Sequence, residues 1–348
     1  MKVHTIGIDL GKTKFHIVGL NERGEVVIRK QFSRAQLLHF TAHRKVYLIG
    51  MEACGGAHFL GRALQQQGHE VRLIPAQYVK PYVKTNKNDY IDAEAIAEAV
   101  SRPTMRFVPI KSDDQLDLQS LHRVRERWVS RRTAVINQIR SLLLERGITV
   151  RKGRRYIEAA LPGILEDADA KLSGALRLLL AQLKLERDQM AKRLEEADAL
   201  IEQTALENEA CRRLVKIPGL GPITATAVIA AIGNGAAFRK GREFAAWMGV
   251  VPREHSTGGK QKLLGISKRG NRYLRKLFVQ GARALLQQKT KQTPGLRAWL
   301  EKLTARSHHH VVGVALANKL ARMAWAVLAT GEAYRAPLPA AGPQLRSL

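Results

Sequence analysis

The sequence predicts an α/β domain with an RNase H-like outline, followed by a mostly helical remainder. Three observations support this: three strand-like segments in succession at the start, then alternation of helix and strand, then long stretches with helical periodicity. Of the 348 residues, 45% are hydrophobic and 25% charged, which is typical of globular protein. A chain of this length has room for two or three domains.

The first domain is expected over residues 1–110. Its first two strands are joined by a Gly-Lys-Thr turn, the Gly55-Gly56 pair opens a helix, and Pro75 stops the last strand. An alanine-rich helix closes the domain. The expected elements are strands at 3–10, 14–20 and 25–32, a helix at 34–43, a strand at 45–51, a helix at 55–67, a strand at 70–74 and a helix at 89–100.

Four carboxylates fall where these elements begin or end: Asp9, Glu52, Asp89 and Asp92. Sheet ends of this outline bring Asp9 and Glu52 side by side, and the later helix brings the other two, which share one face. Acids at the ends of buried strands are unfavourable unless a cation joins them. The pattern therefore predicts a site for one or two divalent metal ions and, through them, phosphate. Any single one of these acids could instead cap a helix or pair with a lysine.

The chain is strongly basic, with 58 Lys and Arg against 30 Asp and Glu, a net charge of +28 and a pI of about 10.6. This balance favours polyanionic partners, nucleic acid first, although a basic ribosomal-type protein would show the same charge. Cys54 and Cys211 are expected to be reduced and buried in a cytoplasmic protein. No signal peptide is recognisable, and Lys319 and Arg322 interrupt the most apolar stretch, so we expect a soluble protein with no membrane partner.

A helical linker and coiled coil are expected over residues 111–207. An arginine-rich helix spans 113–147, and a 4-3 apolar repeat runs through 170–206, with Arg187 at one core-type position. Two pairings remain open. The repeat can form a hairpin with 113–147 within the chain, or it can pair between chains.

The domain expected over residues 208–333 begins with a glycine turn between two helical patterns, at 217–225. Such a turn predicts a helix-hairpin-helix, in which backbone N–H groups near Gly219 and Gly221 bind a DNA phosphate. The alternative is a plain tight turn. Residues 334–348, which contain three prolines, are expected to be a disordered tail.

A polar glycine loop at 252–260 contains Ser256 and Lys260. A hydroxyl that lies beside cations and bound phosphate can attack phosphorus, although a Ser-Thr-Gly-Gly loop is also common without such a role. A cluster of basic residues follows the loop and is interpreted as a phosphate-binding surface, with a solvated charged face as the alternative. Its members are Lys268, Arg269, Arg272, Arg275 and Lys276.

In combination, these motifs resemble, end to end, those of the DEDD-type bacterial insertion-sequence transposases, the family that includes the pilin-gene inverting recombinases. The resemblance covers roughly residues 3–280. The segments that carry it are Gly7-Ile8-Asp9, Met51-Glu52-Ala53-Cys54-Gly55, Lys87-Asn88-Asp89-Tyr90-Ile91-Asp92-Ala93, Ile217-Pro218-Gly219-Leu220-Gly221, His255-Ser256-Thr257-Gly258-Gly259-Lys260 and Gly265-Ile266-Ser267-Lys268-Arg269-Gly270.

The resemblance implies a RuvC-like domain, a coiled coil and a C-terminal transposase domain. It implies that Asp9, Glu52, Asp89 and Asp92 bind Mg²⁺ and that Ser256 attacks DNA to form a phosphoserine-DNA intermediate. Thr257 and Ser267 remain alternatives to Ser256. It also implies a non-coding guide RNA, the bridge RNA, that pairs with donor and target DNA. The active form would be a homo-tetramer, a dimer of dimers, acting on the nucleoid in the bacterial cytoplasm.

Three other functions are considered. A RuvC-like two-metal DNA junction endonuclease would use the same acids without a covalent intermediate, so a trapped protein-DNA adduct separates it from the recombinase. The segment 7–14 is similar to the first phosphate loop of actin-like sugar kinases, but no second Asp-Gly loop follows. A non-catalytic nucleic-acid-binding protein would tolerate Asp9→Asn.

Overall fold

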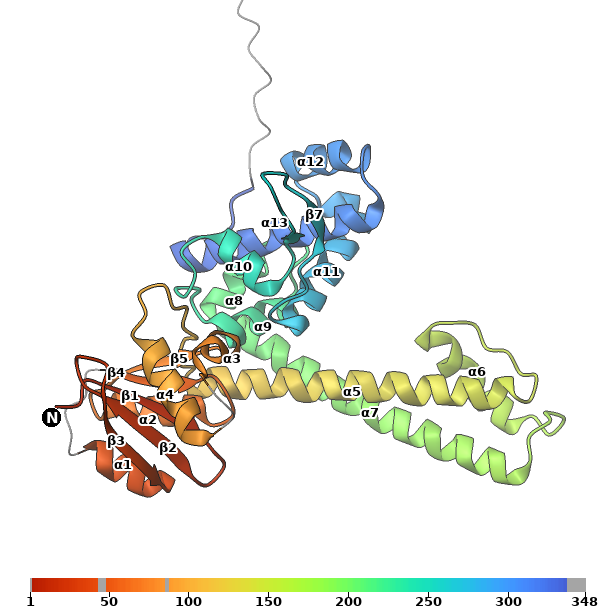
Figure 1. Cartoon of the computed structure of the whole chain (residues 1–348). Helices are drawn as coiled ribbons and strands as arrows, with labels where there is room; N and C mark the ends of the chain where they lie inside the picture. Colours follow the sequence, from red (N-terminus) through yellow and green to blue (C-terminus); the bar gives the residue numbers. More distant parts are fainter. Residues whose placement is uncertain (1, 43–47, 85–87, 337–348) are drawn as a thin grey trace, which may run out of the picture. The chain divides into compact units, whose positions relative to one another are not determined.

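The computed structural model describes residues 2–42, 48–84 and 88–336, and the chain divides into two compact units, 1–116 and 117–348 (Figure 1). Each unit has its own apolar core and is described by itself. Four parts of the predictions lie outside the described residues. These are the last residue of the helix expected at 34–43, the first residues of the strand expected at 45–51, Lys87 of the third acidic motif, and residues 337–348 of the tail.

The N-terminal unit is built on a five-stranded mixed sheet of order β3-β2-β1-β4-β5. The first three strands pair antiparallel, whereas β4 and β5 run parallel to β1, which confirms the predicted RNase H-like outline. The strands are β1 (Thr5–Leu10), β2 (Phe15–Leu20), β3 (Val26–Phe32), β4 (Leu48–Glu52) and β5 (Glu70–Ile74).

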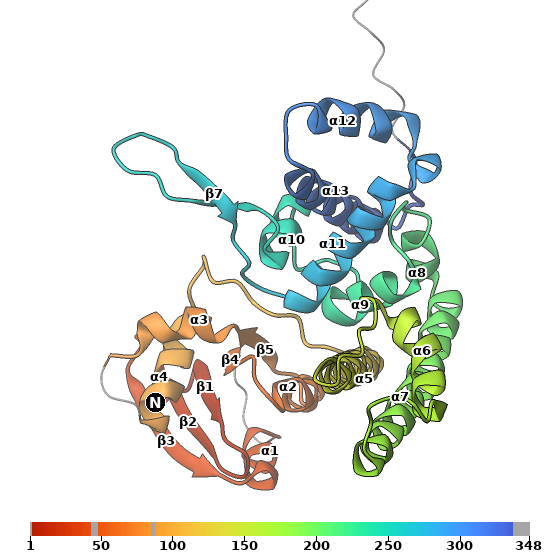
Figure 2. The same ribbon diagram turned by 90° about the vertical axis from the view of Figure 1, so that its right-hand side faces the viewer.

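Helices cover both faces of this sheet (Figure 2). On one face, Ile6 and Ile8 of β1 pack with Leu60 of α2 in a fully buried core. The alternate residue Gly7 faces α4 on the other side, as the two-residue period of a strand requires. The helices of this unit are α1 (Arg34–Ala42), α2 (Ala57–Gln66), α3 (Ala76–Val79), η1 (Lys80–Tyr82) and α4 (Asp89–Val100).

Three helices form an elongated arm: α5 (Asp113–Leu144), whose first turn belongs to the N-terminal unit, α6 (Arg154–Glu166) and α7 (Gly174–Glu207). The predicted apolar repeat lies on the buried side of α7, and its first part packs with α5 and α6. Ion pairs Arg125–Asp198 and Arg131–Glu186 join α5 to α7. The buried stripe therefore packs within the chain, as in the hairpin alternative. Helix α6 was not predicted from the sequence, because Pro162 inside it argues against a helix.

The rest of the second unit is mostly helical, as predicted, around a core centred on α13. Helix α13 is long and apolar enough to span a membrane by length and composition, but its residues Leu316, Leu320 and Ala324 are fully buried against other helices of the unit. It is therefore a core helix of this unit. The elements are α8 (Glu209–Leu214), α9 (Pro222–Ile232), α10 (Gly241–Met248), β6 (Pro252–Glu254), β7 (Leu263–Ile266), α11 (Arg272–Gln287), η2 (Lys289–Lys291), α12 (Pro294–Thr304) and α13 (His309–Thr330).

Candidate active site

Two of the predicted acids meet at one edge of the sheet. The parallel register of β1 and β4 pairs Ile8 with Met51, so Asp9 and Glu52 come directly after paired residues on adjacent strands. Both side chains are half-buried. The prediction that the strand ends bring these two carboxylates side by side agrees with this register.

The other two acids lie in the first turn of α4. Asn88 caps the helix by accepting a hydrogen bond from the backbone N–H of Tyr90 at 2.9 Å, which places Asp89 and Asp92 just inside the N-terminus. Helix α4 lies directly on β1 and β4 because Gly7 and Gly50 leave room for its backbone and for Val100. This close packing brings the first turn of α4 to the edge where Asp9 lies.

The negative charges of all three other acids act on the Asp9 carboxyl group. Its pKa is raised, first by burial and then by the negative charges of Asp92, Asp89 and Glu52, while His16 acts in the opposite direction. A carboxylate that is half-buried among three others is unfavourable until a cation joins it. The site therefore fits a divalent metal ion in its donor set, which consists of hard carboxylate oxygens, and in its electrostatics.

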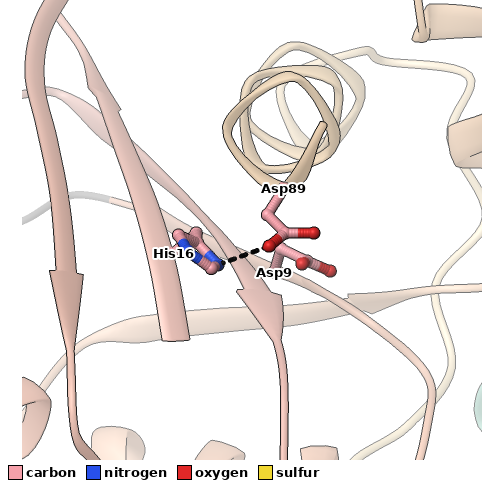
Figure 3. Close-up of side chains that lie close together, drawn as sticks. All are labelled: Asp9, His16 and Asp89. Atoms are coloured by element: carbon pink, nitrogen blue, oxygen red, sulfur yellow. Dashed lines mark ion pairs between the residues drawn. The ribbon is translucent and has the colours of Figure 1, made fainter. Parts of the chain in front are cut away.

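His16 completes the cluster and was not predicted. It is the cross-strand partner of Asp9 in the β1–β2 pair, and its Nδ1 lies 3.5 Å from Oδ2 of Asp89 (Figure 3). One ligand atom from each of Asp9, His16 and Asp89 lies within 4.8 Å of the others. The signal was present in the sequence, since a tight turn at 11–14 makes the residues that flank it face each other.

A pocket of about 380 Å³ opens beside these three residues. Its remaining lining comes from Gln31 and from the turn between β1 and β2, with Lys12 and Lys14 among its residues. Cations close to an acidic metal site are suited to a phosphodiester, since they balance the charge of the phosphate that the metal holds. The turn therefore adds basic groups that the sequence analysis did not assign to the site.

Cys54 lies next to the acids and is exposed, so the expectation that both cysteines are buried is wrong for Cys54 and confirmed for Cys211. Burial, Glu52 and Asp9 raise the pKa of the Cys54 thiol, in that order. A thiol held protonated in this way is a poor nucleophile. Both cysteines are free, as predicted.

Ser256 lies in the second unit, in a hairpin rather than a plain loop: β6 and β7 pair antiparallel and project from the helices (Figure 2). The Ser256 hydroxyl donates a hydrogen bond to Oε1 of Glu254 at 2.6 Å, and Nε2 of Gln261 donates to the same oxygen at 3.2 Å. These hydrogen bonds lower the pKa of Glu254. Residues 252–265 are all exposed, so a polymer as wide as DNA can reach this hydroxyl.

The predicted helix-hairpin-helix corresponds to α8 and α9 with the turn between them. Gly219 has φ +88°, and a Cβ there would lie 3.2 Å from the carbonyl oxygen of Gly281 on α11. Gly219 therefore serves both the turn and close packing on α11. Gly221 is exposed at the N-cap of α9, and the N-terminus of a helix is suited to a phosphate.

Two family models match the chain: a transposase model over residues 6–147, and the IS116/IS110/IS902 transposase family over residues 211–295. A probable family 20 transposase of Pseudomonas aeruginosa is 46% identical over 336 residues, covering 96% of this chain and 99% of that protein. The transposase of element IS1328 from Yersinia enterocolitica is 43% identical, covering 95% and 98%. The chain is an IS110/IS116/IS902-family transposase.

Membership of this family establishes the class of reaction and identifies DNA as a partner. The transposase cleaves and transfers DNA strands to move an insertion sequence element, and its DEDD domain implies the use of a divalent metal. All four acids lie within the first match, and Ser256 lies within the second. The transposase of IS1111A from Coxiella burnetii is similar over nearly its whole length, with 42% identity over 96% of this chain and 92% of that protein.

The basic cluster of the transposase divides into two groups in the structure. Arg275 donates from Nη1 to the backbone carbonyls of Met248 and Arg269, both at 3.0 Å, and Lys276 forms an ion pair with Glu126. The remaining members are exposed at or before the first turn of α11, with Lys268 at φ +54°. They are Lys268, Arg269 and Arg272. Lys260 is exposed in the hairpin, where its N–H donates to the carbonyl of Thr257 at 3.0 Å.

Proposed function

We propose that this transposase cleaves DNA through Ser256, with Asp9, Glu52, Asp89 and Asp92 as ligands for Mg²⁺. The observation that supports Ser256 is its 2.6 Å hydrogen bond to the Glu254 carboxylate on an exposed, glycine-containing hairpin. The backbone carbonyl of Thr257 accepts a hydrogen bond from the N–H of Lys260 in the turn. Ser267 is half-buried beside the start of α11. Ser256 is therefore the hydroxyl of the three that has both exposure and a carboxylate acceptor.

The covalent step balances without a further reactant. The Ser256 oxygen forms a bond to phosphorus, the bond from phosphorus to one sugar oxygen breaks, and the hydroxyl proton passes to Glu254. The released sugar oxygen takes this proton back from Glu254. In the second step a sugar hydroxyl of the other DNA strand attacks the phosphoserine and gives its proton to Glu254. The bond from phosphorus to the serine oxygen breaks, and that oxygen takes the proton from Glu254, which restores the serine and joins the new strand. One phosphoester bond is exchanged for another, so the energy of the cleaved bond is retained.

The four acids would supply the metal site at the sheet edge. Mg²⁺ bound there would offset negative charge on the reacting phosphate oxygens. His16 holds Asp89 by their contact at 3.5 Å, and Lys12 and Lys14 lie close enough to pair with flanking phosphates. For the proposal to hold, this edge and Ser256 must reach the same phosphate, within one chain or between chains of an assembly.

The remaining parts of the proposal are a bridge RNA that pairs with donor and target DNA, and a homo-tetramer that acts on the nucleoid. The motif resemblance supports both parts, and the net charge of +28 favours polyanionic partners such as RNA. Co-purification of a specific non-coding transcript from the flanks of the gene would test the RNA. Light scattering of the protein with that transcript would test the tetramer.

A trapped adduct tests the nucleophile. We expect full-length protein incubated with element-end DNA, transcript and Mg²⁺ to form a denaturant-stable protein-DNA species, and Ser256→Ala to form none. Ser267→Ala and Thr257→Ala are matched controls and should retain it. Metal-dependent cleavage with no adduct in any variant would instead support the two-metal junction endonuclease, for which the acid cluster alone suffices.

A further inference from the structure

The turn between α5 and α6 concentrates positive charge in a segment that contains none of the acidic, glycine-turn or serine motifs. We call residues 146–156 the α5–α6 tip. From residue 148 onward it lies between the stretches that the two family models match, 6–147 and 211–295. The segment 140–155 holds six cations and one acid, Glu145. The six are Arg140, Arg146, Arg151, Lys152, Arg154 and Arg155.

The tip has a defined backbone. Arg140 on α5 donates from Nη2 to the carbonyls of Arg151 and Gly153, at 3.2 and 2.7 Å. Gly153 has φ +126°, and a Cβ there would lie 3.0 Å from the ring of Tyr156. A conformation that glycine alone adopts freely, with two carbonyls tied to one guanidinium, holds the tip in one shape.

This shape gathers guanidinium groups at one aromatic ring. The Cζ atoms of Arg151 and Arg155 lie 4.8 and 4.7 Å from the centroid of the Tyr156 ring, and Nη2 of Arg155 donates to its hydroxyl at 2.7 Å. Each cation–π contact stabilises its own partner, but the two like charges repel each other. Arg146, Arg151, Lys152, Arg154 and Arg155 are all exposed. An anion that bridges the guanidinium groups would relieve the repulsion.

We infer that the α5–α6 tip binds the phosphate backbone of duplex DNA. Backbone contact is favoured over base reading, because the single aromatic ring already contacts two guanidiniums and offers little surface for base stacking. DNA is favoured as the polyanion because it is the substrate of a transposase. This inference does not depend on the serine nucleophile or on a guide RNA.

The test uses the triple variant Arg151→Gln, Lys152→Gln, Arg155→Gln in the full-length protein. Binding to a labelled duplex of random sequence is measured by fluorescence anisotropy over a range of salt concentrations. We expect the slope of log K against log salt to fall by about 2 to 3, and affinity at moderate salt to fall at least tenfold, since each lost phosphate contact removes about 0.9 from the slope. The charge-matched control, Arg23→Gln, Lys80→Gln, Arg106→Gln, changes exposed residues of the other unit and should keep the wild-type slope.

Three results would overturn the inference: an unchanged slope, an equal loss in the control, or a loss confined to a structured RNA hairpin tested in parallel. Thermal unfolding checks that the triple variant folds. If it does not, Lys152→Gln alone leaves both arginine contacts with Tyr156 in place and should still lower the slope by about 0.9. Ser256→Ala should keep the wild-type slope of log K against log salt. Failure of the nucleophile proposal can therefore be distinguished from failure of the DNA-binding inference.

Discussion

A Cβ atom on Gly7 of β1 would lie 2.0 Å from the carbonyl oxygen of Ala93 on α4. The strand and the helix are therefore in backbone contact at Gly7, two residues before Asp9. The same helix carries Asp89 and Asp92 in its first turn. The distance between the acids of the sheet and those of the helix depends on this contact.

We predict that Gly7→Ala separates the two pairs of acids. The added methyl meets backbone, which cannot move away as a flexible side chain would, so we expect a loss of about 1–3 kcal/mol in unfolding free energy. DNA cleavage and any stabilisation by Mg²⁺ should fall with it. Gly163→Ala on α6 is the matched control: nothing lies within 4 Å of its Cβ, and a helical alanine should stabilise by about 0.5–1 kcal/mol. Wild-type cleavage by Gly7→Ala would contradict this account.

Asp9→Asn should change stability and activity in opposite directions. Burial and three neighbouring acids raise the pKa of Asp9, so its ionised form destabilises the metal-free fold, and a neutral amide should raise the melting temperature at pH 7 without metal. Cleavage should fall at least about a hundredfold, because a charged ligand is lost. The stabilisation that Mg²⁺ gives the wild type should disappear. Exposed Glu22→Gln should change neither quantity.

The sequence predicted the strands of the sheet and helices α1, α2 and α4, because each depends on local patterns, whereas α3 and η1 were not predicted. Strand ends, a tight turn and an alanine-rich helix with acids in its first turn can each be recognised from a single stretch of sequence. The family motifs then linked them.

Three features that depend on tertiary packing were not predicted. They are the place of His16 in the site, helix α6, and the hydrogen bonds of Arg275 to backbone carbonyls. His16 joins the acids only through the register of β1 with β2. Pro162 lies inside α6 although proline disfavours helix interiors, because the buried Ile157 and Leu161 anchor that helix in a core shared with α5 and α7. Arg275 resembles its basic neighbours in sequence, and only the fold directs it to two carbonyls.

His122 should make the stability of the second unit depend on pH. Thr226 donates its hydroxyl to the carbonyl of Pro222 at 2.7 Å, so it accepts from Nε2 of His122 at 3.1 Å, and Nδ1 accepts from Tyr273 Oη at 3.0 Å. Burial first, and then Arg125, lowers the pKa of His122 to about 4. Since the unfolded chain binds the proton more readily, stability should be lost as pH falls from about 6.5 to about 4.

The measurement is denaturant unfolding of wild type and His122→Asn at pH 7 and pH 5. The variant loses the hydrogen bonds of His122, but asparagine does not bind a proton, so lowering the pH does not destabilise it through this position. The stability difference between the two proteins should therefore shrink by about 2 kcal/mol at the lower pH. His255→Asn, a substitution in the exposed hairpin, is the control for the loss of a histidine at the surface. A difference for His122→Asn that does not change with pH would mean that its imidazole is protonated as easily in the fold as outside it.

Arg272 and Arg275, three residues apart on α11, should respond differently to substitution by glutamine. Arg275 ties the start of α11 to the end of α10 through the carbonyl of Met248, so Arg275→Gln should cost about 1–3 kcal/mol in unfolding free energy as this part-buried acceptor loses a charged donor. Arg272 is exposed, and Arg272→Gln should leave stability within about 0.5 kcal/mol but lower the salt slope of DNA binding by about 0.9. Chemical denaturation and anisotropy titrations on the same two variants separate the roles. Equal losses of salt slope in both would mean that Arg275 also contacts phosphate and leaves its carbonyl partners when DNA binds.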